Sequence, residues 1–317
     1  MKNKIGIEPP ATNVSGFIKY DLRSEETYAS RWVLPMKPGE IAANDIRKAE
    51  RGMLSIGAAP FRTGADAIFD HAKYFAVSHD SFPMPKNGSL QFSVDIKATT
   101  PVMQPVKLIE AASTDTPNDG RPYRQPAIKG QQAAMIFNMT NVETRQAFNW
   151  FVSGSFVFAL IERLPGSVTP PGLTASDSTD GGLDSIHSQI IKSAPMKPGE
   201  THSLAIRYTR CAAASTVDYF LDGNLFAHVD HVGFPLDTHR GACTGVDHSL
   251  YSLPGGEHRR RMDTFAMGHG LYSMPEAFLF QHRDAPEQAV SIPIGERLFG
   301  QDAGGEFSRF EVMITPE

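Results

Sequence analysis

Short segments in which apolar and polar residues alternate recur along the whole of this 317-residue chain. Such alternation is typical of β-strands that lay one face on a core, and scattered glycines and prolines predict the turns between them. Helical spacing of apolar residues is confined to 25–33 and 44–51, both short. The pattern predicts an all-β fold of two packed sheets. The expected strands lie near 15–22, 52–57, 90–98, 132–140, 146–153, 155–163, 203–210, 215–221, 224–230, 263–270, 276–281 and 306–314.

The clearest local signal is a hairpin at 216–229. Two alternating runs flank the dipeptide Asp222-Gly223, which favours the positive φ angles of a type I′ turn. Counting outward from this turn predicts which residues face each other across the two strands. The expected pairs are Leu221 with Asn224, Tyr219 with Phe226, and Val217 with His228.

The strands expected at 132–140 and 146–153 are apolar on both faces, although a strand with one solvent face should carry polar residues there. We expect one face to fill the core with Met135, Phe137, Met139, Phe148, Trp150 and Val152. The other face is apolar but dotted with amides and hydroxyls, which is the composition of a small-molecule pocket. This second face would carry Ile136, Asn138, Thr140, Asn149, Phe151 and Ser153.

Two alternatives remain open for this pair of strands. In the first, long loops cover the second face and its asparagines bond to loop backbone, as buried amides commonly do. In the second, the two faces are reversed. The pocket would then be lined by Met135, Phe137, Phe148 and Trp150.

The charge balance argues against nucleic acid as a partner. Thirty basic and thirty-five acidic side chains give a net charge of −5, and the longest basic run is Arg259–Arg261. The chain contains neither GxGxxG after a strand nor GxxxxGK[ST], and it lacks the GxSxG elbow of serine hydrolases. We therefore expect no nucleotide cofactor.

Three features of the sequence bear on the cellular compartment: its apolar stretches, its glycosylation sequons and its cysteines. The first residues carry no apolar stretch typical of a signal peptide, and no later run approaches the length of a membrane span, which predicts a cytoplasmic protein without a membrane partner. Glycosylation sequons at Asn13, Asn87 and Asn138 would favour secretion if a signal peptide had been removed. Cys211 and Cys243 fit one disulfide, two free thiols or two buried side chains.

Histidines are a second candidate source of chemistry. His79 is expected at the exit of an apolar strand, where functional sites are often built, and its alternative role is to stabilise a turn. His269 lies between Gly268 and Gly270, and glycine in a strand often marks the close approach of a ligand or another backbone. The alternative for His269 is a satisfied core histidine.

A metal site is not expected. His228 and Asp230 share a face of their strand, but zinc and iron need a third ligand at fixed geometry. No HxH or HxxxH element supplies one. A solvated strand end is the better interpretation of this pair.

Six segments carry a resemblance to a known family when they are taken in order. They are GFIKYD at 16–21, APF at 59–61, SHDSF at 78–82, FVFALIERL at 156–164, VDYFLDG at 217–223 and FGQDAGGEFSRFEV at 299–312. Together they resemble an uncharacterised family of bacterial and fungal concanavalin-A-like proteins over nearly the whole chain. The resemblance implies one jelly-roll domain over 1–317, with two antiparallel sheets and a ligand cleft on the concave sheet. It implies no activity.

The paired acids of glycoside hydrolases with this fold are missing. Those enzymes carry two acids at ExDxE or ExDxxE spacing on one strand, because retaining hydrolysis needs a nucleophile and an acid/base around the scissile bond. Here Glu143 is expected in a turn, Glu162 is alone on its strand, and Glu257 lies in a Gly-rich and Arg-rich loop. A glycosidase of that type is not expected.

What remains is an apolar, aromatic-rich site with neutral hydrogen-bonding groups, which suits reactions limited mainly by orientation and mild carbonyl polarisation. We therefore expect a cofactor-free cyclase or lyase of specialised metabolism with a hydrophobic polyketide or terpenoid substrate. At class level it resembles fungal hetero-Diels–Alderases. The alternative is a non-catalytic, lectin-like carbohydrate-binding module. A homodimer is left open.

The cyclase hypothesis assigns a role to each candidate residue. Asn138 and Asn149 would bond a substrate carbonyl, Phe151 and Tyr272 would stack on its ring, and His79 or His269 would assist formation of a reactive enone. Further substrate contacts are expected from Tyr251 and Trp150.

Overall fold

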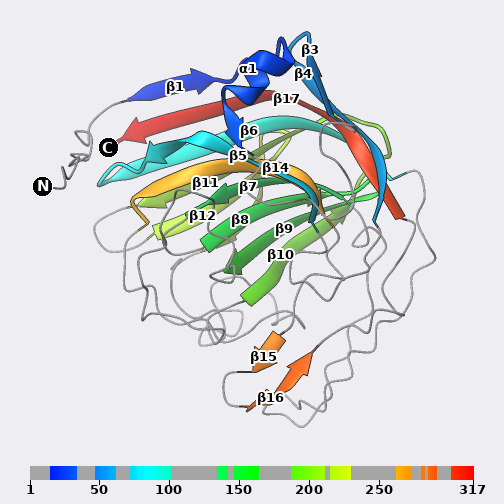
Figure 1. The fold of residues 1–317 in the computed structure, drawn as a ribbon. Coiled ribbons are helices and arrows are strands. Elements are labelled where there is room, and N and C mark those ends of the chain that lie inside the picture. The colour runs from blue at the N-terminus through cyan, green and yellow to red at the C-terminus, as the bar shows by residue number, and fades with distance from the viewer. Residues whose placement is uncertain are drawn as a thin grey trace, which may run out of the picture.

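Two antiparallel β-sheets pack face to face in the computed structural model of the protein (Figure 1). The predicted all-β, concanavalin-A-like jelly-roll sandwich is confirmed. The structure describes residues 15–33, 47–61, 72–100, 134–141, 146–163, 187–210, 215–229, 262–272, 280–282, 285–290 and 301–317.

One sheet has eight strands in the order β13-β12-β11-β6-β17-β4-β3, with β1 paired to β17 beside this path. Its strands are β1 (Gly16–Lys19), β3 (Arg47–Glu50), β4 (Met53–Phe61), β6 (Gly88–Thr99), β11 (His202–Arg210), β12 (Ser215–Leu221), β13 (Asn224–Val229) and β17 (Gln301–Pro316).

The other sheet has seven strands in the order β10-β9-β8-β7-β14-β5-β2. Its strands are β2 (Trp32–Val33), β5 (Ala72–Pro83), β7 (Ala134–Thr140), β8 (Gln146–Val152), β9 (Phe156–Arg163), β10 (His187–Pro195) and β14 (Thr264–Tyr272). A short helix, α1 (Glu25–Ala29), precedes β2, and the strands β15 (Phe280–His282) and β16 (Ala285–Val290) form a separate small sheet.

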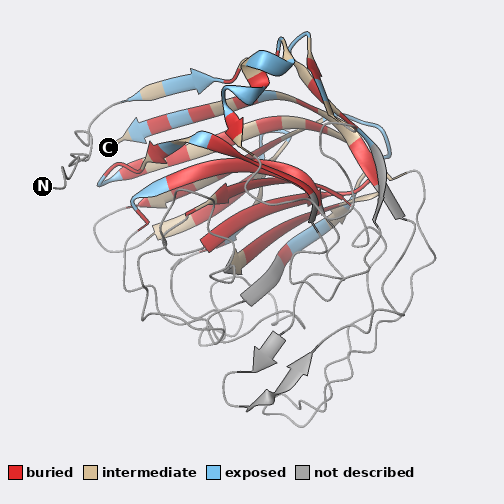
Figure 2. Cartoon of the chain, in the orientation of Figure 1, coloured by how far each residue is buried: buried red, intermediate tan, exposed pale blue. Residues whose placement is uncertain are grey.

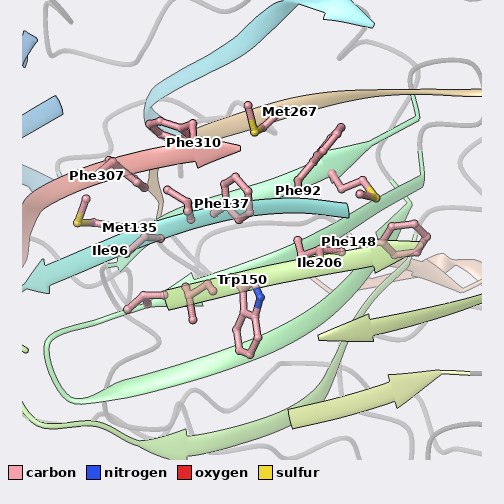
Figure 3. Packing of buried hydrophobic residues seen from close by; sticks show 14 of the residues in the cluster. Phe92, Ile96, Met135, Phe137, Phe148, Trp150, Ile206, Met267, Phe307 and Phe310 are labelled. Atoms are coloured by element: carbon pink, nitrogen blue, oxygen red, sulfur yellow. The ribbon is translucent and has the colours of Figure 1, made fainter. Parts of the chain in front are cut away.

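The main core lies between the two large sheets (Figure 3). Phe92, Ile96 and Ile206 point inward from the eight-stranded sheet, where they meet side chains from β7, β8 and β14. The indole of Trp150 is fully buried here, and its Nε1–H donates to the backbone oxygen of Ala205 at 3.0 Å. Trp150 is therefore fixed by both packing and a hydrogen bond.

The two sheets differ in how their second faces are buried (Figure 2). Along β6, buried positions alternate with half-exposed ones, as expected for a sheet with one face toward solvent. Along β8, every position is buried, and along β7 only the last is not. The seven-stranded sheet is thus covered on both faces around β7 and β8.

The predicted hairpin at 216–229 is correct at its turn and shifted beyond it. Asp222 and Gly223 have φ angles of 51° and 78°, and Leu221 pairs with Asn224 as predicted. An irregularity follows between Tyr219 and Phe220, so the later pairs are Tyr219–Ala227, Asp218–His228 and Val217–Val229. A bulge of this kind moves the register by one residue, which counting from the turn cannot anticipate.

The helical interpretation of 44–51 is wrong for its described part. Arg47–Glu50 is a strand that pairs with β4, and Arg51 and Gly52 form a turn with φ angles of 54° and 83°. The helical pattern at 25–33 is realised only by α1, which begins at a Ser24 capping box. Within the described residues, no helix is long and apolar enough to cross a membrane.

Candidate functional site

The candidate site lies on the face of the seven-stranded sheet that is turned away from the eight-stranded sheet, called here the outer face. Strand register places its residues in rows that cross the sheet. One row runs Leu160, Asn149, Asn138, Gly268 and Val77 from β9 to β5. Asn138 and Asn149 are thus direct cross-strand neighbours.

The rows on either side of the amides differ in chemistry. On one side the row is Phe158, Phe151, Ile136, Gly270 and Phe75, which is aromatic at three of its positions. On the other side the row begins Glu162, Ala147, Thr140. We call Asn138, Thr140, Asn149 and Glu162 the polar corner. The outer face therefore joins a polar corner to an apolar, aromatic region.

The polar corner contains buried atoms without hydrogen-bond partners. The side chains of Asn138 and Asn149 are only 4% and 5% exposed. Among the residues that the structure describes, none bonds to Asn138 Oδ1, Asn149 Oδ1 or Thr140 Oγ1. Buried polar groups are nearly always paired, so three such atoms on neighbouring positions call for an explanation.

The orientation of the Asn149 amide is set by Glu162. Asn149 Nδ2 donates a hydrogen bond to Glu162 Oε2. A carboxylate only accepts, so this contact requires the nitrogen of the amide on the Glu162 side. The oxygen of Asn149 is consequently the atom without a partner in the described part of the chain, and it is an acceptor on the outer face.

A hydrogen bond from the core fixes the position of β9, the strand that carries Glu162. The Tyr219 hydroxyl is fully buried and donates to the backbone oxygen of Leu160, the residue that pairs with Asn149. Burial raises the pKa of Tyr219 well above its usual value, so the hydroxyl keeps its proton and remains a donor. Gln146 Nε2 donates to the backbone oxygen of Glu162 at 2.8 Å.

Gly268 gives the Asn138 amide its space. A Cβ atom at Gly268 would lie 2.2 Å from Asn138 Oδ1 and 3.1 Å from the Phe75 ring. The glycine that the sequence places beside His269 therefore does mark a close approach, but the group that approaches is the amide of Asn138.

His269 lies in the core and does not reach the outer face. Its side chain is fully buried, with Nε2 3.0 Å from the Tyr28 hydroxyl and its ring against Trp32. Burial, with a smaller contribution from Arg47, lowers the pKa of His269 well below 6.5. The structure thus places His269 in the core, as the alternative expected, but its Nδ1 has no hydrogen-bond partner among the described residues.

The remaining predicted site residues fall into three groups. Phe151 is on the outer face, as expected, whereas Trp150 belongs to the core between the sheets, so the reversed assignment of faces is wrong. His79 is an exposed residue inside β5, where its backbone N–H donates to Arg31 at 2.8 Å. Tyr251 and Asp230, and the side chain of Tyr272, lie outside the described residues.

Two features of the site were not assigned from the sequence. Glu162 looked isolated because its partner Asn149 is on a neighbouring strand, and Tyr219 acts from the opposite sheet. Asn138, although part of a sequon, is buried, which disfavours its glycosylation. In the part of the chain that the structure describes, no group of three or more His, Cys, Asp or Glu residues could hold a metal ion.

Comparison with solved structures finds remote likeness. Endo-1,3-β-glucanase from Streptomyces sioyaensis is 10% identical, with 98% of this chain and 100% of that chain covered and a TM-score of 0.43. The alginate lyase AlyA5 from Zobellia galactanivorans is 8% identical, with 90% and 95% covered and a TM-score of 0.38. The lectin UEA-II, complexed with galactose, is 8% identical, with 94% and 99% covered and a TM-score of 0.31. Likeness at this level carries no information about activity.

Comparison with curated proteins gives no match. One family model does match, over residues 42–316, which is most of the chain and includes every residue of the polar corner. The protein belongs to the family of unknown function DUF6081.

Proposed function

We propose that the outer face binds a neutral, hydroxyl-rich ligand of the saccharide class, with its hydroxyls at the polar corner and its ring against the aromatic row. The observation that carries this proposal is a group of three buried atoms that have no partner among the residues that the structure describes: Asn138 Oδ1, Asn149 Oδ1 and Thr140 Oγ1.

Buried polar atoms of this kind lower the stability of a folded protein. A buried donor or acceptor without a partner costs about 1 to 3 kcal/mol in protein stability. Three such atoms on adjacent positions of one sheet face therefore lower the stability of the folded protein when no ligand pairs with them. Hydroxyl groups of a ligand would donate to both amide oxygens, while the Thr140 hydroxyl can donate or accept.

The neighbouring row supplies the apolar side of the site. Phe151 and Phe158 meet edge to face, with ring centroids 6.0 Å apart and an interplanar angle of 74°. Phe156 stacks against Phe158 at 6.1 Å. A sugar ring has apolar C–H faces as well as hydroxyls, so it matches a surface with aromatic groups on one side and acceptors on the other.

A cyclase acting on a hydrophobic substrate is the second candidate. The apolar composition of the face supports it, since eight buried hydrophobic residues cluster there. The polarity of Asn149 weighs against it, because the nitrogen of the amide lies on the Glu162 side and one of its two hydrogens is donated to Glu162. A carbonyl ligand would meet an oxygen of Asn149 instead of a donor.

A paired binding screen tests the proposal. The purified full chain would be applied to an array of neutral oligosaccharides and, in parallel, melted in the presence of lipophilic enones. Retention of saccharides without a thermal shift from enones is the expected result. Enone stabilisation with no saccharide retained would replace the proposal with the cyclase hypothesis.

A further inference from the structure

We propose that Glu162 is a positioning residue that fixes the hydrogen-bonding polarity of the site through Asn149, and so selects ligands that donate over ligands that only accept. This inference rests on the proposed function, because it specifies how the same outer face discriminates between ligands. The observation behind it is the hydrogen bond from Asn149 Nδ2 to Glu162 Oε2.

A primary amide has two orientations that differ by a half-turn and occupy nearly the same volume. In one, Asn149 offers its oxygen to the rest of the outer face, and in the other it offers its nitrogen. Rotation to the second would turn the oxygen toward the Glu162 carboxylate, which has no hydrogen to give. Loss of a hydrogen bond to a charged acceptor corresponds to roughly a tenfold to hundredfold preference for the first orientation.

The carboxylate is held where this selection requires it. Glu162 pairs with Ala147, two residues before Asn149 on β8, so the two side chains are diagonal neighbours on one face. Gln146, on β8, donates a hydrogen bond to the backbone oxygen of Glu162. Tyr219, in the core, donates to the backbone oxygen of Leu160, two residues before Glu162 on β9. Diagonal neighbours on paired strands are within reach of long side chains, which explains how Glu162 contacts an amide on another strand.

The consequence extends to the whole polar corner. With Asn149 fixed, its oxygen stands beside that of Asn138, and neither has a partner among the described residues. Two neighbouring acceptors match a ligand with two neighbouring donors, such as adjacent ring hydroxyls. The same ligand with those hydroxyls converted to methyl ethers loses every donor and gains methyl groups, so the site should reject it. The added bulk acts equally on the unaltered protein and on a Glu162 variant, so a difference in discrimination between the two reports the donors.

The first test needs no ligand. In nuclear magnetic resonance of the labelled full chain, one of the two Asn149 Nδ2 hydrogens should be protected from exchange. Replacement of Glu162 by glutamine (E162Q) should reduce that protection, because a neutral amide accepts more weakly and can also donate to Asn149 Oδ1, which allows both orientations of the Asn149 amide. The control E306Q alters a carboxylate that pairs with Lys97 on the other sheet and should leave Asn149 unchanged. Unprotected Asn149 hydrogens in the unaltered protein would overturn the inference even if E162Q failed to fold.

The second test uses neutral oligosaccharides printed beside their fully O-methylated counterparts. The unaltered protein and E306Q should retain only the free sugars. E162Q should bind the free sugars about tenfold more weakly and discriminate less against the methylated ones. Equal discrimination by E162Q would overturn the role of Glu162 and leave the proposed function standing. If the unaltered protein retained no sugar, the proposed function would fall, and the exchange measurement would still decide whether Glu162 orients Asn149.

Discussion

Asn138 and Asn149 face each other directly across β7 and β8, and both amide oxygens lack a hydrogen-bond partner among the described residues. The pairing follows from strand register, so the two groups are held together by backbone that is itself buried. Gly268 on one side and Glu162 on the other fix how the amides are placed. Substitutions at these positions can distinguish a role of the amides in ligand binding from a role in folding.

On β8, a residue that faces the core and a residue on the outer face should respond differently to substitution. Trp150→Ala removes a fully buried indole and its bond to Ala205, and should lower the free energy of unfolding by roughly 3 to 5 kcal/mol. Asn149→Ala removes both the hydrogen bond to Glu162 and a buried oxygen that has no partner among the described residues, so the two changes offset each other. Stability should then change by about 1 kcal/mol or less, while saccharide retention weakens. Urea unfolding and the oligosaccharide array measure the two effects. A large loss of stability in Asn149→Ala with unchanged retention would assign Asn149 a structural role.

The space that Gly268 leaves beside Asn138 should matter for ligand binding as much as the Asn138 amide itself. In Gly268→Ala the new methyl group would lie 2.2 Å from Asn138 Oδ1, so the amide must move. The obstructing atom is the end of a side chain, and we therefore expect a modest drop in melting temperature with a clear loss of saccharide binding. Gly16→Ala is the matched control, since a Cβ there meets nothing within 4 Å. Unaltered binding by Gly268→Ala would show that the position of Asn138 is unimportant.

His269 should make stability depend on pH. Burial holds its pKa well below 6.5 in the folded state, so above that pH the imidazole is neutral in both folded and unfolded chains and contributes no pH dependence. Below that pH the unfolded chain binds a proton that the folded chain does not. The free energy of unfolding should then fall by roughly 1.4 kcal/mol per pH unit, down to the folded-state pKa.

His269→Gln is the variant that isolates this contribution. The variant should lose stability less steeply than the unaltered protein between pH 6.5 and 5. Other titrating groups act equally in both proteins, so the difference between the two slopes reports His269. Identical slopes in urea unfolding at several pH values would mean that His269 takes up its proton in the folded state.

The sequence predicted the composition of the outer face because the pleat alternates strictly along a strand. Phe148 and Trp150 fill the core, while Asn149 and Phe151 lie on the other face, and this period-two relation survives in both β7 and β8. The interpretation of His269 rested on a different signal, the two glycines on either side of it. Its flanking glycines lie on the outer face, where one accommodates an amide, while the histidine points the opposite way.

Other features depend on contacts between distant segments and could not be predicted locally. The partner of Glu162 is on the next strand, and the register of β12 and β13 shifts at a bulge. The strand β10 was not predicted, and β5 was expected only as an apolar strand that ends near His79, whereas it continues to Pro83. Each of the two has an irregular register with a neighbour. The expectation of a single cooperative domain stays a prediction, and one shared unfolding transition by fluorescence and circular dichroism would support it.

If the Asn138 amide serves a ligand and destabilises the empty protein, Asn138→Leu should separate the two effects. Leucine keeps the branching of asparagine at Cγ and lacks the amide oxygen, so stability should be unchanged or higher by about 1 kcal/mol, while saccharide retention is lost. Asn141→Leu is the control, because the buried Asn141 Nδ2 donates to Thr264 at 2.7 Å and its loss should destabilise the fold. If Asn138→Leu instead unfolds more readily and retains the same sugars, the amide is structural and the account is wrong.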